Sequence, residues 1–241
     1  MAAISRRHRH IEVLAALCIR GAKELAASAN PGHLTCGEQH SMSKINALCV
    51  YCGSSPGTDP AFAAAARAFG KILAENGVRL IYGGGSVGMM GTLAEAVLKH
   101  GGEATGIIPD FLVRRERPVQ NGVQQIVVPD MHVRKRKMFE LADGFVALPG
   151  GVGTLEELVE QLTWVQLGRH KKPILIANIK GYWDPLLTLI EHMRAVEFVP
   201  PALNIDLLIA KDVEEILPKL TDAARKVAEA EKTMTVPLER M

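Results

Sequence analysis

The sequence predicts an α/β fold, a doubly wound parallel sheet of about seven strands with helices on both faces. Short runs that are apolar throughout alternate with longer segments of helical periodicity. Strands that are buried on both faces are typical of parallel sheets covered by helices. Clusters of glycine and serine follow three of the apolar runs. In such sheets the loops at the carboxyl ends of the strands carry the ligand-binding residues.

Seven apolar runs are strand candidates, and each is short enough for one pass through a sheet. They cover residues 46–52, 78–82, 103–108, 123–128, 143–148, 173–178 and 206–210. The segments between and after them have apolar residues at helical spacing, and they cover residues 60–76, 88–100, 131–142, 152–168, 182–196 and 211–230. This alternation predicts one Rossmann-like sheet in which the strands run parallel.

The length of 241 residues is enough for one sizeable domain and too short for a second full one. We expect residues 42–241 to form that single domain and residues 1–41 to be a disordered N-terminal extension. Basic residues before a short apolar stretch in this extension faintly resemble a secretory signal. Charged residues flank the apolar stretch on both sides, which argues against a signal. A natural start at Met42 is a further alternative, and we favour the tail.

Composition argues against several functional classes. The net charge of +2 predicts no surface for nucleic acid or for a membrane, and no apolar run approaches the ~20 residues of a membrane-spanning helix. Cys49 and Cys52 form a C-x-x-C pair, but they lie in an apolar strand candidate and no second pair completes a zinc site. We therefore expect reduced thiols, no metal and a cytoplasmic location.

The segment after the fifth strand candidate predicts an anion-binding site. The strand breaks at Pro149, Gly150 and Gly151, and a helix starts directly afterwards. Glycines let the backbone come close to a ligand, and a helix start presents unpaired N–H groups and partial positive charge. Together they bind phosphate without a basic side chain. Glu156 and Glu157 follow at once, and a carboxylate beside an anion is costly unless it takes part in chemistry.

A second glycine cluster follows the second strand candidate. Gly83, Gly85 and Gly88 match G-x-G-x-x-G, the dinucleotide-binding pattern, with Asp110 as a ribose partner. However, the motif follows the second strand rather than the first, and Asp110 lies beyond a proline. A tight strand-to-helix turn explains the glycines equally well. No Walker A lysine follows any of these loops, so the sequence predicts no ATP-type phosphate site.

A basic run at residues 134–137 opens a helix candidate, for which Asp130 is the predicted N-cap. Consecutive cations usually form a solvated face, and this is our interpretation of Arg136 and Lys137. Arg134 is different because the helix start is expected beside the Pro149 loop. There its planar guanidinium could hold a phosphate or a ribose by two parallel hydrogen bonds.

Three sequence blocks resemble the signature of the Lonely Guy family of cytokinin-activating phosphoribohydrolases, which were long mislabelled lysine decarboxylases. The blocks are residues 82–91, 131–135 and 149–157. The resemblance extends over residues 45–198, and it leaves the first 41 residues and the C-terminal tail outside. The pattern P-G-G-x-G-T-x-x-E is specific, and its combination with M-H-x-R-K makes chance agreement improbable.

The resemblance implies hydrolysis of the N-glycosidic bond of a nucleoside 5′-monophosphate, with release of free base and ribose 5-phosphate. Arg134 and Glu157 match the catalytic pair. The matching nucleotide-binding positions are Glu116, Lys135, Gly150, Gly151, Val152, Gly153, Thr154, Leu155, Glu156 and Thr163. We add Ser54, Gly83 and Gly84 from the neighbouring loops as candidate substrate contacts. The resemblance implies no cofactor and no metal, and members are usually homodimers that pair near the helix after Pro149.

This activity is compatible with the chemistry of the residues. Cleavage of a glycosidic bond develops positive charge on the ribose, which a carboxylate stabilises. Glu157 is expected one turn inside the phosphate-binding helix, within reach of a ribose fixed by its 5′-phosphate. The helix dipole is expected to favour the ionised form of Glu157. No residue stands out as the acid that protonates the leaving base, and the sequence does not distinguish cytokinin, adenine and pyrimidine bases.

Two other functions are compatible with the same loops. An NAD(P)-dependent oxidoreductase would use the Gly83 loop, but it would need an acidic residue at the end of the third strand, where Ile107, Ile108 and Pro109 stand. A non-catalytic protein that binds nucleotides or a molybdenum cofactor would need neither Arg134 nor Glu157. We discount lysine decarboxylation because the chain lacks the strand-helix context of a pyridoxal lysine.

Overall fold

The computed structural model describes residues 44–113, 121–199 and 207–234. In this part of the chain seven parallel strands form one sheet in the order β4-β3-β2-β1-β5-β6-β7. The strands are β1 (Ala47–Tyr51), β2 (Arg79–Tyr82), β3 (Ala104–Pro109), β4 (Gln124–Val128), β5 (Gly144–Ala147), β6 (Ile174–Ala177) and β7 (Leu208–Ala210). The α/β class and all seven strand candidates are confirmed.

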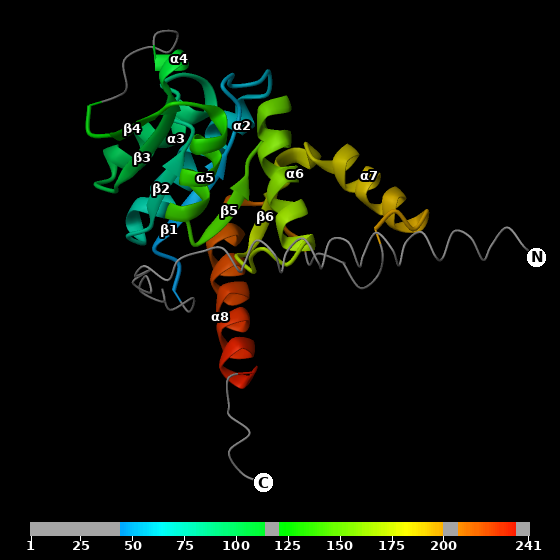
Figure 1. The fold of residues 1–241 in the computed structure, drawn as a ribbon. Coiled ribbons are helices and arrows are strands. Elements are labelled where there is room, and N and C mark those ends of the chain that lie inside the picture. Colours follow the sequence, from blue (N-terminus) through cyan, green and yellow to red (C-terminus); the bar gives the residue numbers. More distant parts are fainter. Residues whose placement is uncertain (1–43, 114–120, 200–206, 235–241) are drawn as a thin grey trace, which may run out of the picture. The chain divides into compact units, whose positions relative to one another are not determined.

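Helices follow the strands as the periodicity predicted (Figure 1). They are α2 (Pro60–Glu75), α3 (Gly88–Lys99), α5 (Met131–Leu141), α6 (Val152–Gln166), α7 (Asp184–Ala195) and α8 (Ile216–Met234). Asp130 caps α5, because its carboxylate accepts a hydrogen bond of 2.8 Å from the backbone N–H of Val133. Two short elements were not predicted, because each is only about one helical turn long and shows no repeating apolar pattern: α4 (Asp110–Val113) and η1 (Ile179–Gly181). The 3-10 turn η3 (Val213–Glu215) lies within the helical segment predicted at 211–230.

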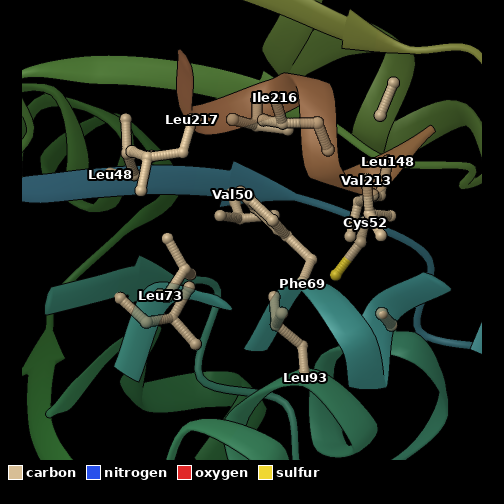
Figure 2. Packing of buried hydrophobic residues seen from close by; sticks show 14 of the residues in the cluster. Leu48, Val50, Cys52, Phe69, Leu73, Leu93, Leu148, Val213, Ile216 and Leu217 are labelled. Carbon is tan, nitrogen blue, oxygen red and sulfur yellow. The ribbon is translucent and has the colours of Figure 1, made fainter. Parts of the chain in front are cut away.

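Each face of the sheet buries its own apolar layer. Side chains alternate along a strand, so Leu48 and Val50 of β1 point to one face and Cys49 points to the other. Figure 2 shows the first layer, where the β1 residues pack between Leu73 of α2 and Leu217 of α8. The second layer holds side chains from α5 and α6. Since both faces are covered, the central strands are apolar throughout, as the sequence pattern indicated.

The sheet reverses its direction of growth at β1. The chain adds β2, β3 and β4 on one side of β1, then returns and adds β5, β6 and β7 on the other. The carboxyl ends of β1 and β5 therefore lie side by side, with Tyr51 paired to Ala147. Ligands of doubly wound sheets bind in the crevice at such a reversal.

Two expectations are not tested. Residues 1–43 lie outside the described residues, so the N-terminal extension at 1–41 and the domain at 42–241 stay predictions.

Among the described residues, no helix combines the length and the apolar character needed to cross a bilayer.

Candidate active site

Three glycine-rich loops meet at the reversal point and bind one another through their backbones. The N–H of Gly53, after β1, donates to the carbonyl of Pro149 over 3.1 Å. The N–H of Met89, in the first turn of α3, donates to the carbonyl of Gly53, also over 3.1 Å. A Cβ at Gly88, where φ is +63°, would lie 2.2 Å from the carbonyl oxygen of Ser54. The predicted convergence of the three loops is therefore present.

The glycines after β2 are explained by contacts within the protein. A Cβ at Gly83 would lie 2.2 Å from Nη2 of Arg134, and a Cβ at Gly84 would lie 3.2 Å from Cβ of Ile108. The first N–H groups of α3 are also occupied, since Met89 and Met90 both donate to Gly53. A dinucleotide-binding loop needs those N–H groups for a pyrophosphate. This packing favours the tight turn over the oxidoreductase alternative.

Arg134 and Glu157 form a buried ion pair between α5 and α6. Nη1 of Arg134 donates to Oε1 of Glu157 over 2.7 Å, and each residue is 8% exposed. Nε of Arg134 donates to the carbonyl of Ile107 at the end of β3, over 3.0 Å. Two fixed bonds hold the guanidinium plane in one orientation. A charge-assisted hydrogen bond in a site with little water is strong and well aimed.

Burial has the largest effect on the protonation of Glu157. Loss of water raises the pKa of this carboxyl above its usual value, and the nearby charge and hydrogen bond of Arg134 oppose that rise without cancelling it. The contribution of the helix dipole, which is expected from the sequence to favour the ionised form, stays a prediction.

The first turn of α6 is open toward a cavity. The N-cap Gly151 supplies no side-chain acceptor, so the first N–H groups of the helix keep their hydrogen-bonding capacity. A Cβ at Gly151 or at Gly153 would meet no atom within 4 Å. Nothing in the described chain requires glycine at these two positions. Gly150 differs, because a Cβ there would lie 2.2 Å from Oγ1 of Thr154.

The cavity beside this turn has a volume of about 370 Å³. It brings together nine of the predicted site residues: Ser54, Gly83, Arg134, Gly151, Val152, Gly153, Thr154, Glu156 and Glu157. A smaller cavity of about 220 Å³ shares Ser54 and Gly151 with it and also contacts Gly150, Phe62 and Tyr182. The larger cavity is thus lined both by the open helix end and by the ion pair.

The remaining predicted residues lie elsewhere or are not described. Gly84 is packed against β3, and Leu155 packs against the apolar layer of α5 and α6. Thr163 is exposed on α6, and its hydroxyl donates to the carbonyl of Val159 over 2.8 Å. Lys135 does not line the cavity, and Glu116 lies outside the described residues. The substrate-binding roles of these five residues stay predictions.

The cavity also has an apolar wall that sequence reasoning missed. Its residues come from strand ends and from the helix turns that follow them: Val50, Tyr51, Cys52, Met90, Ile108, Leu112 and Met131. In the sequence they resemble ordinary core residues. The one available signal was their position at the carboxyl ends of strands, which meet at this edge of the sheet.

Comparison with known proteins identifies the family. Residues 90–220 match the family described as "Possible lysine decarboxylase". A cytokinin riboside 5′-monophosphate phosphoribohydrolase of Rhodococcoides fascians is 44% identical over 168 residues, which cover 69% of this chain and 85% of that protein. The chain belongs to the Lonely Guy family. A protein of Arabidopsis thaliana with the same enzyme name is 41% identical over 184 residues, covering 76% of this chain and 85% of that one.

Solved structures agree on the fold of this Lonely Guy chain. A molybdenum cofactor binding protein of Rippkaea orientalis superposes with a TM-score of 0.57 at 22% identity, covering 74% of this chain and 97% of that one. The molybdenum cofactor carrier protein of Chlamydomonas reinhardtii gives 0.56 at 20% identity, with 76% and 99% covered. At this level of identity the likeness concerns the fold alone.

Proposed function

We propose that this chain hydrolyses the N-glycosidic bond of a nucleoside 5′-monophosphate and releases free base and ribose 5-phosphate. The main support for this proposal is the buried Arg134–Glu157 pair beside the open first turn of α6. One cavity thereby combines backbone N–H groups at the start of α6 that can bind a phosphate, here called the phosphate seat, with a carboxylate that can act on the sugar. The relatives named cytokinin riboside 5′-monophosphate phosphoribohydrolase support the same reaction.

In the proposed reaction the 5′-phosphate binds the free N–H groups at the start of α6, where the helix dipole favours an anion. This contact fixes the ribose near Glu157 in the next turn. As the bond to the base breaks, the anomeric carbon gains positive charge, and the ionised Glu157 stabilises it or orients the attacking water. Arg134 holds the carboxylate in place and offsets the negative charge that gathers there.

The test is incubation of the purified chain with a panel of nucleoside 5′-monophosphates that carry cytokinin, adenine and pyrimidine bases. Release of free base is followed by chromatography. We expect turnover of at least one purine monophosphate, including AMP or its isopentenyl derivative, and essentially none of the matching nucleosides, because they lack the phosphate that α6 binds. Binding of monophosphates without any turnover would instead favour a non-catalytic nucleotide-binding protein.

We also propose that the chain forms a homodimer through α6 and α7. The exposed face of α6 carries Val152 and Val159, and the exposed Leu167 follows as its C-cap residue. Helix α7 has no buried residue although it is a full-length helix. Apolar side chains left exposed along neighbouring helices are typical of protein interfaces. Thr163 lies on the same face.

A cytoplasmic location is the last part of the proposal. Cys49 and Cys52 are free, buried thiols in and after β1. Burial raises the pKa of both thiols well above the usual value, so they stay protonated and unreactive. Unpaired core thiols are typical of proteins from reducing compartments. Fractionation of the source cells with an antibody against the chain would test the location.

A further inference from the structure

Lys135 is the centre of a second set of ion pairs between α5 and α6. Its Nζ contacts Oε1 of Glu156 at 2.5 Å and Oε1 of Glu160 at 2.9 Å. The side chain of Lys135 is 13% exposed, against 51% for Glu156. Burial disfavours the charge of Lys135, but the hydrogen bonds that its ammonium group donates to both carboxylates outweigh this effect and raise its pKa. Both of these partners lie on α6, and Lys135 does not line the cavity.

The contact between Lys135 and Glu156 affects ligand binding, because Glu156 lies beside the proposed phosphate seat. It lines the cavity, two residues after Thr154 in the same helix start. An uncompensated carboxylate there would repel a phosphate bound by the first turn of α6. The lysine contact places a positive charge on the side of Glu156 that faces α5. The single charge of the lysine, which Glu156 shares with Glu160, thereby offsets part of the negative charge next to the phosphate seat before any ligand arrives.

Glu160 of α6 forms the second ion pair of Lys135. It lies one turn after Glu156, and its Oε2 is buried with no hydrogen-bond partner within the described chain. A carboxylate in such surroundings needs a fixed cation. Lys135 therefore bridges two successive turns of α6. Because Lys135 follows Arg134 directly on α5, this bridge also fixes the register at which Arg134 meets Glu157.

We propose that Lys135 is a positioning residue that acts through Glu156 and Glu160 and does not contact the nucleotide itself. It offsets part of the charge of Glu156 beside the phosphate seat and holds α5 against α6. This inference rests on the proposed function for its substrate, and it changes the role that the family resemblance implies for Lys135. A direct contact and a positioning role predict different KM values for a variant in which Lys135 and Glu156 both lose their charge.

The experiment compares Lys135→Met, Glu156→Gln and the double variant, with AMP or the best monophosphate of the panel as substrate. We expect Lys135→Met to raise KM about tenfold at low salt while kcat falls less, since the uncovered Glu156 repels the phosphate. The rise in KM should shrink with added salt, because salt screens this repulsion. In the double variant KM should return to within about threefold of the wild-type value.

Several controls keep the outcomes separate. Lys135→Arg should retain most of the wild-type KM, and Lys226→Met, which removes a lysine paired with Asp222 at 2.8 Å on α8, should change neither kinetic constant. Lys135→Met combined with Glu160→Gln removes the buried unpaired carboxylate, so it supplies a folded variant should the single one fail to fold. A KM that stays raised in the double variant with Glu156→Gln would mean that Lys135 contacts the nucleotide, which overturns the inference.

Failure of the proposed function gives a different result. Should the wild-type chain bind AMP without hydrolysing it, the Kd of each variant for AMP is measured by calorimetry in place of KM. A Kd that recovers in the double variant supports the positioning role of Lys135, and a Kd that stays raised contradicts it. A wild-type chain that binds no monophosphate would overturn both proposals.

Discussion

Gly83 and Arg134 occupy complementary positions: the missing side chain of the glycine is the space that the guanidinium fills. A Cβ at Gly83 would lie 2.2 Å from Nη2 of Arg134. The glycine lies after β2 and the arginine on α5, so the Arg134–Glu157 ion pair depends on a loop that resembled a dinucleotide-binding motif. The absence of a side chain at Gly83 thus makes room for the guanidinium of Arg134.

Substitution of Gly83 by alanine should therefore impair catalysis through Arg134. The added methyl group must displace the guanidinium from Glu157, and we expect kcat/KM to fall at least about tenfold. Gly85→Ala is the matched control. A Cβ there would meet the flexible end of Met90, at 2.6 Å from its terminal methyl, so the loss should be smaller. Equal kinetics of Gly83→Ala and wild type would contradict this dependence.

Glu157→Gln should abolish turnover while nucleotide binding persists. The amide keeps the shape of the side chain but cannot carry the charge that stabilises the developing positive ribose. We expect kcat to fall at least about a hundredfold, with a Kd for AMP close to that of wild type. Single-turnover kinetics and calorimetry measure the two quantities. A variant that keeps a near-wild-type rate would exclude Glu157 as the catalytic carboxylate.

The pH dependence of the reaction should reflect the buried position of Glu157. The proposed reaction requires the ionised carboxylate, and desolvation raises the pKa of this group. The rate should therefore fall as pH decreases, with the acid limb above the pH at which an exposed glutamate titrates. Arg134→Met should move the titration of Glu157 further upward, because the arginine lowers its pKa. Carboxyl ¹³C shifts of the free protein follow the titration, and an unshifted glutamate would contradict the prediction.

The three glycines around the start of α6 should respond differently to alanine. Gly151→Ala and Gly153→Ala meet open space, so we expect folded proteins with weakened phosphate binding. Gly153→Ala should gain about 0.5–1 kcal/mol of stability because it lies inside the helix. Gly150→Ala should destabilise the protein, since its methyl group would collide with Thr154. Chemical denaturation and inhibition by inorganic phosphate separate the two effects.

The proposed homodimer predicts a response to charge on the outer face of α6. Val159 is 44% exposed, and Val159→Asp would put a carboxylate into the interface. We expect the variant to elute as a monomer, with a mass near 26.1 kDa by light scattering, while the wild type has twice that mass. A wild-type chain that is already monomeric would refute the dimer.

Much of this protein could be predicted from the local pattern of residues. Apolar runs such as 143–148 and helical spacing such as 152–168 predicted the strands and helices, because these periodicities follow from the geometry of one element. The helix start at Gly151 was predictable for the same reason, since one loop and one helix form it. Asp130 was recognisable as a cap because its bond spans three residues.

Relations between distant elements were decided by the tertiary structure. Arg134 and Glu157 are 23 residues apart, and their contact exists because the sheet reverses between β1 and β5 and places α5 next to α6. The same arrangement explains why Gly83 must be a glycine and why Lys135 faces Glu160 instead of the cavity. Burial set the direction of the Glu157 pKa, since desolvation depends on every element packed around the carboxylate. A local pattern cannot predict such effects, because they arise from atoms brought together only by the folding of the whole sheet.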